Sequence, residues 1–425
     1  MARRIPTRLP APVLGLVRAF GLPVAEVTRY WRQERVALGR GLLALFVAAN
    51  ADLAAGIVLG KAESQIGELP GLLVLIPAAI AMRGATFGAL GARLGTAIHT
   101  GEFEPGLERG GYLWRQLEAI GVLTLATSVE AALLAKVLSV AIGLESVPVW
   151  DLVAVSVIGG VLASLVLVVV TIGLARAAQR RGWNMDDVGA PAITATGDLF
   201  AVPALLVATV LAQRGAITLA VGIGLVVAGV VGTAYGWRHR AADVRRIVRE
   251  SFIVLTFAAT VSVLAGIVLE SRSELFTAIP ALLVLFPPFV AMFGSLGGIL
   301  SSRLTSKLHL GLLSPRAFPG KIAALDFSVT YLFTAVIFAF VGAATWILAS
   351  VLGLDAPSLG QLVGISLIGG LMGTTLLSAV SYTAATATFR FGLDPDNHAI
   401  PIVTSVMDFL GMLCLVAAMA MLGVG

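Results

Sequence analysis

Long apolar runs dominate the chain from about residue 41 to its end. Eleven of them hold roughly 20 residues or more, the length that an α-helix needs to cross about 30 Å of hydrocarbon. The pattern therefore predicts an all-α polytopic membrane protein with eleven transmembrane helices. The predicted spans lie at approximately 41–60, 70–98, 116–141, 150–175, 190–212, 215–236, 251–270, 280–302, 323–352, 360–386 and 399–423.

Two of these runs, near 70–98 and 280–302, differ from the others because they are long and contain internal proline and several glycines. Proline removes a backbone donor, and in membrane helices such positions mark bends or breaks that line a cavity. We therefore expect both helices to be bent or broken within the membrane.

The chain contains a second copy of itself, displaced by 210 residues without a gap. PGLLVLIPAAIAMRG from Pro70 becomes PALLVLFPPFVAMFG from Pro280, and the same displacement holds across most of each half. A constant displacement indicates duplication. It predicts two repeats of five helices each, over residues 40–213 and 250–425. Each candidate functional residue can then be compared with the residue at the counterpart position of the other repeat.

One apolar run, from Gly215 to Trp237, has no partner in the other repeat. Because each repeat has an odd number of spans, direct fusion would invert the second copy, and this extra helix restores its direction. We therefore expect two parallel five-helix repeats, joined by a linking transmembrane helix and cytoplasmic loop over 214–249. A parallel fused pair is equivalent to a homodimer, so the protein is expected to be a monomer.

Composition and charge support this class. Hydrophobic residues make up 58% and charged residues 12%, against about a quarter charged in soluble domains. The net charge of +5 does not indicate a nucleic-acid partner, because the basic residues fall in alternate loops: eight Arg precede residue 41, and five lie in 237–250. By the positive-inside rule, the N-terminus is cytoplasmic and the C-terminus is outside the cell membrane. Residues 1–39 are expected to form an amphipathic arm in contact with membrane lipids.

Two acidic residues at bilayer depth match across the repeats: Asp198 and Asp408. A charged residue there costs about 2.5–3.5 kcal/mol on insertion scales and usually has a function. Thr194 and Thr404 also match, and each lies one helical turn before its Asp, on the same helix face. Together they would form an all-oxygen site suited to a hard divalent cation such as Mg²⁺. The alternative is that each Asp only hydrogen-bonds a neighbouring helix.

A polar segment precedes each of these two helices, NMDDVGAP from Asn184 and DPDNHAIP from Asp394. Carboxylates at this position can attract a cation, but they are also ordinary caps of a helix N-terminus. Both roles stay open. The residues concerned are Asp186, Asp187, Asp394, Asp396 and Asn397.

These motifs resemble the membrane domain of MgtE-type magnesium transporters, and the fused layout is similar to solute carrier family 41. The last-helix pattern consists of Asp394, Pro395, Pro401, Thr404 and Asp408, and of Pro191, Thr194 and Asp198 in the first repeat. The second-helix pattern consists of Pro77, Gly84, Arg93 and Leu94, and of Pro287, Gly294, Arg303 and Leu304. The resemblance implies a divalent-cation pathway between the repeats, with a largely hydrated ion held by Asp198 and Asp408. Two departures are Asn184–Met185 in place of Asp-Pro, and Ala85 and Ser295 where the family often has Asn.

Five polar residues in the spans of the first repeat have a residue of a different type at the counterpart position of the second repeat. One interpretation is internal ion pairing, for example of Arg83 with Asp52 or Glu130. Another makes Glu130 or Asp52 a second ion or proton site that couples transport to a gradient. The five residues are Asn50, Asp52, Arg83, Glu130 and Lys136, and their counterparts are Thr260, Ser262, Phe293, Phe340 and Trp346.

The hypothesis from sequence is transport of a divalent cation, with magnesium as the preferred candidate, through a pathway between the repeats. No credible hydrolase or nucleotide-binding motif occurs, so neither an enzyme nor a cofactor is expected, and the metal ion is the substrate. The alternatives are a secondary transporter of another solute, organic or sodium-coupled, and a membrane scaffold that transports nothing.

Overall fold

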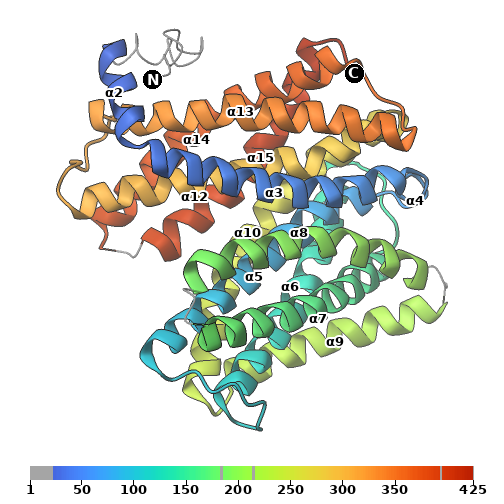
Figure 1. Cartoon of the computed structure of the whole chain (residues 1–425). Helices are drawn as coiled ribbons and strands as arrows, with labels where there is room; N and C mark the ends of the chain where they lie inside the picture. The colour runs from blue at the N-terminus through green and yellow to red at the C-terminus, as the bar shows by residue number, and fades with distance from the viewer. Residues whose placement is uncertain (1–22, 182–184, 213–215, 393–394, 425) are drawn as a thin grey trace. The chain divides into compact units, whose positions relative to one another are not determined.

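A computed structural model describes residues 23–181, 185–212, 216–392 and 395–424 (Figure 1). The side chains of 185–191, 194, 211–212, 216–217 and 395–398 lie outside this description. All regular secondary structure in the described residues is α-helical. The long helices are α3 (Arg35–Lys61), α5 (Leu72–Thr100), α6 (Tyr112–Ile142), α7 (Val149–Arg181), α8 (Met185–Ala212), α9 (Ala216–Trp237), α10 (Ala242–Glu270), α12 (Pro280–His309), α13 (Lys321–Leu352), α14 (Leu359–Arg390) and α15 (Pro395–Met421). The short helices are α2 (Val24–Gln33), α4 (Glu63–Gly67) and α11 (Ser273–Ala278).

Each predicted span coincides with one long helix. Among the described residues, ten helices are long and apolar enough to cross a membrane by length and composition. The remaining one, α8, has a described apolar segment of Ala195–Val210. The protein is therefore an all-α, multi-pass membrane protein, as the sequence predicts.

The helices form two compact units, each of which mixes segments from both halves of the chain. The first-repeat unit is residues 54–284, and the second-repeat unit is residues 1–53 together with 285–425. The boundaries fall inside α3 and α12, so each of these helices contributes to both units.

In the first-repeat unit, α10 packs against α5 and α6, although α10 begins the second sequence repeat. The contact is so close that a Cβ atom on Gly266 would overlap the carbonyl of Val74. The same relation holds 210 residues apart, where a Cβ on Gly56 would overlap the carbonyl of Val284. The first helix of each repeat is thus packed on the second helix of the other, and only glycine allows the backbones to approach this closely.

In the second-repeat unit, α3 likewise packs on a helix from the other half of the sequence. A Cβ on Gly41 would lie 3.0 Å from the ring of Phe333 in α13. Further along α3, the rings of Phe46 and Phe340 meet edge to face with centroids 4.8 Å apart. These contacts join the N-terminal helix to α13 through small and aromatic side chains.

Interhelical hydrogen bonds show that the two repeats fold alike. Two bonds of the first repeat recur 210 residues later, between the counterpart positions. The matched bonds are Thr124–Ser164 (3.2 Å) with Thr334–Thr374 (2.7 Å), and Ser156 to the Ser128 carbonyl (2.7 Å) with Ser366 to the Phe338 carbonyl (2.7 Å).

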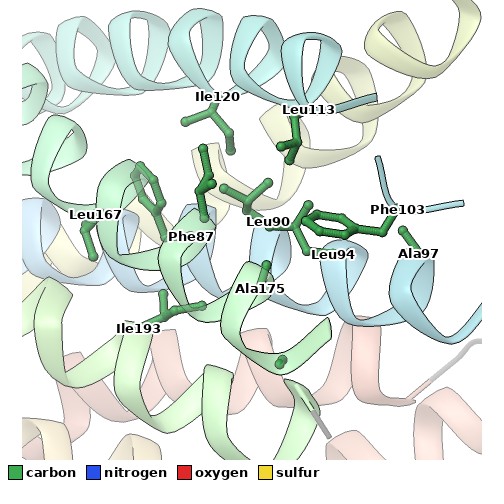
Figure 2. Close-up of a cluster of buried hydrophobic side chains, with 12 residues drawn as sticks. Phe87, Leu90, Leu94, Ala97, Phe103, Leu113, Ile120, Leu167, Ala175 and Ile193 are labelled. Atoms are coloured by element: carbon green, nitrogen blue, oxygen red, sulfur yellow. The ribbon is translucent and has the colours of Figure 1, made fainter. Parts of the chain in front are cut away.

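An apolar cluster occupies the end of the first-repeat unit where α5 ends (Figure 2). Figure 2 shows Phe87 and Leu90 of α5 between Ile120 of α6 on one side and Leu167 of α7 and Ile193 of α8 on the other. The second-repeat unit has an equivalent cluster, which contains Leu300, Leu304, Leu308, Leu313, Ala323, Phe327, Tyr382 and Ala385. The two clusters fix the second helix of each repeat against its neighbours.

The linking helix α9 packs on α6, α7 and α10 in the first-repeat unit. Gly222 lies against Trp150, and Gly229 lies against Val129, which places the glycine face of α9 on the protein. Val227 and Val230 are exposed on the rest of its surface. This apolar exposure fits a helix that has lipid on one side.

The second helices were expected to be bent or broken, and the structure shows that they are not broken at their prolines. Helix α5 continues through Pro77, and α12 continues through Pro287 and Pro288. All three prolines lie within the first nine residues of their helices, where few turns precede them. The freed carbonyls then belong to the first turns, and packing helices can satisfy such groups in a membrane protein.

The close contact at Gly266 predicts a large effect of substitution. In Gly266→Leu the new side chain must displace the Val74 backbone, and overpacking of this kind costs about 1–3 kcal/mol or more. We expect a lower melting temperature for the detergent-purified protein. Gly232→Leu in α9 is the control, because a Cβ there meets nothing within 4 Å. Equal melting temperatures for the two variants would contradict the contact.

Candidate ion-binding site

Asp198 lies on α8 beside the helices α5 and α7, which both pack against α8. Its side chain is only 8% exposed. The preceding residue, Gly197, is at the closest approach of the helices: a Cβ there would lie 3.8 Å from the backbone nitrogen of Gly84 and 3.9 Å from Leu167. Two glycines thus bring the backbones of α8 and α5 together next to the carboxylate.

Asp408 occupies the matching position on α15 of the second-repeat unit, and its side chain is half-buried. Thr404, one turn earlier, lies next to α12: a Cβ on Gly294 would be 3.6 Å from the Thr404 methyl group. The Thr404 hydroxyl donates to the carbonyl of Pro401 at 3.0 Å. Because its proton is used inside the helix, the hydroxyl oxygen presents lone pairs to any ligand.

The other predicted site residues are Thr194, Asp186, Asp187, Asp394, Asp396 and Asn397, and they lie outside the described side chains. Among the side chains that are described, no three His, Cys, Asp or Glu residues form a cluster that could hold a metal ion. The predicted ligands whose side chains are described are thus Asp198 in the first-repeat unit, and Asp408 with the Thr404 hydroxyl in the second-repeat unit.

A network of charged and polar side chains joins the N-terminal helix α2 to α12 and α13 in the second-repeat unit; we call it the arm network. At its centre is Asp326, whose side chain is 0% exposed. It accepts from Arg303 at 3.0 Å and from Lys307 at 2.6 Å. Tyr30 donates its hydroxyl to Asp326 at 2.7 Å, and Glu34 pairs with Arg303 at 3.3 Å.

Tyr30 occupies a central place in the arm network because its hydroxyl is both donor and acceptor. It accepts hydrogen bonds from Arg303 at 2.6 Å and from Lys307 at 2.9 Å. Burial, followed by the neighbouring Asp326 carboxylate, raises the pKa of the Tyr30 phenol. The phenol therefore keeps its proton and remains a donor to Asp326.

The first repeat has only a weaker version of this network. Arg93, the counterpart of Arg303, donates to Gln116 at 2.8 Å, and Gln116 is the counterpart of Asp326. Sequence analysis missed the arm network, although the 210-residue displacement aligns Gln116 with Asp326 and could have indicated it. No periodic signal in the sequence pairs Tyr30 with a residue almost 300 positions away.

Arg83, one of the unmatched charged residues, is 1% exposed within the first-repeat unit. It donates to the Ser128 hydroxyl at 2.7 Å, and a Cβ on Gly160 would overlap its guanidinium. Arg83 thus donates to a hydroxyl on α6, and its guanidinium occupies the space that the absent side chain of Gly160 leaves on α7.

The counterparts of these residues in the second-repeat unit are apolar. Phe293 and Phe338 replace Arg83 and Ser128, and their ring centroids lie 4.9 Å apart. Gly370 replaces Gly160 and again makes room, here for the Phe338 ring. The same three positions hold a buried cation in one unit and an aromatic pair in the other.

Lys136 and Asn50 satisfy their polar groups with main-chain and hydroxyl oxygens. The Lys136 ammonium donates to the Ser146 carbonyl and hydroxyl at 3.0 and 2.8 Å and to the Val147 carbonyl at 3.0 Å. The Asn50 amide donates to the Phe46 carbonyl at 2.7 Å. These contacts of Lys136 fix the connection between α6 and α7.

Comparison with known families agrees with this internal symmetry. The family model described as MgtE, divalent cation transporter, matches residues 76–208 and again residues 286–418. The second match begins and ends 210 residues after the first, and together they cover more than half of the chain. The chain belongs to the MgtE divalent cation transporter family. Its members are transporters, so the protein is not classed as an enzyme.

Curated relatives are similar over most of the chain. Solute carrier family 41 member 3 from Rattus norvegicus is 26% identical over 384 residues, which cover 84% of this chain and 81% of the relative. The Mus musculus protein of the same name is 24% identical and covers 89% and 82%. Solute carrier family 41 member 2 from Xenopus laevis is 22% identical and covers 66% and 51%. No solved structure matches the chain at a significant level.

The arm network makes a prediction about stability. Asp326→Asn leaves two cations facing a neutral group, and breaking a buried pair costs about 3–5 kcal/mol. We expect a clear drop in melting temperature, together with faster tryptic cleavage near Arg29 and Arg32. Glu34→Gln removes a partly exposed partner worth about 1 kcal/mol or less and serves as the matched control. A larger loss in the Glu34 variant would contradict the central place of Asp326.

Proposed function

We propose that the protein moves divalent cations, magnesium first, across the membrane, and that Asp198 and Asp408 are the carboxylate ligands of the ion. The observation that carries the proposal is the matched pair of deep acidic residues within a chain of the MgtE family. Each charge in hydrocarbon costs about 2.5–3.5 kcal/mol on insertion scales, and a bound cation would offset that cost. Both halves of the sequence keep this costly residue at the same position.

The residues around each carboxylate support the assignment. Asp198 follows Gly197 at the close approach to Gly84, and Thr404 lies against Gly294, the counterpart of Gly84. The second helix and the last helix of each repeat therefore meet beside the acidic residue in both units. Small residues at these contacts let the backbones of the two helices approach closely.

The chemistry of the ligands fits a hard cation that keeps part of its water. Mg²⁺ prefers six oxygen ligands and dehydrates reluctantly, so one or two carboxylates with several waters suffice. The Thr404 hydroxyl can add an oxygen acceptor next to Asp408 or hold a coordinated water. Carboxylates do not by themselves exclude transition metals, so selection for Mg²⁺ would rest on the size and hydration of the ion.

The proposal predicts that the two aspartates are equally necessary. Asp198→Asn and Asp408→Asn keep the size of the side chain but remove a charged ligand, a loss of about 1.5–3 kcal/mol, or roughly ten- to a hundredfold in affinity. We expect Mg²⁺ uptake into proteoliposomes, followed with an internal fluorescent indicator, to fall by at least about tenfold in each variant. Asp355→Asn, at an exposed loop position in the second repeat, is the control.

The same assay separates the alternative functions. Unchanged Mg²⁺ uptake in both aspartate variants would refute the site and favour a carrier of another solute. An absence of any divalent-cation uptake in the wild-type protein, reconstituted and correctly folded, would favour a scaffold. Loss of uptake in one variant only would refute a shared role for the two carboxylates.

A further inference from the structure

Four matched positions in the transmembrane helices are polar in the first-repeat unit and aromatic in the second-repeat unit. Two are the Arg83 and Ser128 positions described above, where the second repeat has a phenylalanine pair. The other two are the Glu130 and Thr256 positions, which lie where the third helix of one repeat packs on the first helix of the other repeat. The polar set is Arg83, Ser128, Glu130 and Thr256, and the aromatic set is Phe293, Phe338, Phe340 and Phe46.

Glu130 is the acidic member of the polar set, and it lies near the middle of α6. Thr256 of α10 lies near its carboxylate, and the Thr256 hydroxyl is buried without a hydrogen-bond partner among the described residues. Phe46 and Phe340, at the two counterpart positions of the second-repeat unit, meet edge to face in the equivalent helix contact. Glu130 is half-buried, and its Oε2 atom is buried without a hydrogen-bond partner among the described residues.

No ion pair with Glu130 is found among the residues that the structure describes. The helices that pack against α6 are α5, α7, α9 and α10. Arg83 is the charged residue on them at similar depth, and it donates to Ser128; the ion pairs found among described residues of this unit do not include Glu130. The other charged or titratable groups lie nearer the helix ends: Arg93 and His99 on α5, Tyr112, Arg115, Glu118 and Lys136 on α6, Asp151, Arg176, Arg180 and Arg181 on α7, Tyr235 on α9, and Asp243, Arg245, Arg246, Arg249, Glu250 and Glu270 on α10.

The number of oxygen atoms decides which ion such a site can hold. Glu130 and Thr256 together provide three side-chain oxygens, so a Mg²⁺ or Ca²⁺ ion there would need water molecules for the rest of its six or more ligands. A proton needs one oxygen only and no accompanying water. A carboxyl group in hydrocarbon with no cationic partner also avoids the cost of its charge when it is protonated. The site therefore suits a proton better than a metal ion.

We infer that Glu130 is a proton-binding site, present in the first repeat alone, through which movement of the divalent cation is coupled to a proton gradient. The carboxylic acid releases its proton to water when the site is open to one side, and the carboxylate regains a proton from the other side before it is enclosed again. Phe340 has no titratable group, so the second repeat cannot perform this step. The inference rests on the proposed function, because coupling needs a transported ion.

The first test measures proton binding without transport. A membrane-permeant carbodiimide reacts with protonated carboxyl groups in apolar surroundings, and peptide mass spectrometry locates the product. In the full-length protein in lipid, we expect labelling at Glu130 that decreases as the pH rises. Glu145, an exposed acidic residue after α6, is the internal comparison and should stay unlabelled by the apolar reagent. Absence of labelling at Glu130, or labelling independent of pH, would overturn the inference.

The second test measures coupling. Mg²⁺ uptake into proteoliposomes is compared with and without an imposed pH gradient, and the ratio of the two rates is the readout. We expect a ratio different from one in the wild-type protein and in Glu145→Gln, and a ratio of one in Glu130→Gln and in Glu130→Phe, which introduces the residue of the second repeat. A wild-type ratio of one, or a gradient response that persists in Glu130→Gln, would overturn the inference.

The two tests distinguish this inference from the proposed function. If the wild-type protein shows no Mg²⁺ uptake, the proposed function fails, and coupling through Glu130 fails with it even where carbodiimide labels the residue. If uptake occurs and depends on Asp198 but does not respond to the pH gradient, the proposed function stands and the proton site is refuted.

Discussion

A polar group inside a bilayer has no water to bond with, and this constraint explains most of the side-chain arrangements in the protein. Arg83 is placed against Ser128 and the open space at Gly160, and Lys136 donates to three oxygens of the following connection. Asp326 is surrounded by two cations and a phenol. The protein itself thus supplies hydrogen-bond partners that the lipid withholds, three for Lys136 and one for Arg83.

The same constraint limits how the helices assemble. Apolar side chains gain little by leaving lipid for protein, so close packing has to provide the attraction between helices. Gly266 against Val74 and Gly56 against Val284 show how it does so, since backbone contacts backbone at both places. These contacts tie the beginning of each repeat to the other repeat. Neither repeat is complete without the helix that the other one provides, which is the relation expected of two subunits that became one chain.

The sequence predicted the helices and the symmetry, but not the partners of the helices. The length of the apolar runs predicts the eleven long helices, because hydrophobic thickness fixes helix length. The 210-residue displacement singles out Asp198 and Asp408 as a matched pair, and the family match repeats at the same displacement. The displacement does not reveal that α10 packs on α5 and α6, because an apolar helix face looks the same in sequence whichever helix covers it. Pro77 likewise removes a hydrogen bond, but the sequence alone does not show that α5 continues through it. The contact between Tyr30 and Asp326 depends on the tertiary fold alone.

The linking helix has a consequence beyond topology. In a homodimer encoded by one gene, every substitution appears in both subunits, so a charge that benefits one half is forced on the other half as well. When two copies share a single polypeptide, each half can mutate separately. Arg83 in one half can then have Phe293 as its counterpart in the other, and a titratable residue can stand at position 130 while position 340 holds a phenylalanine. The two halves of one chain can thus differ in ways that two identical subunits cannot.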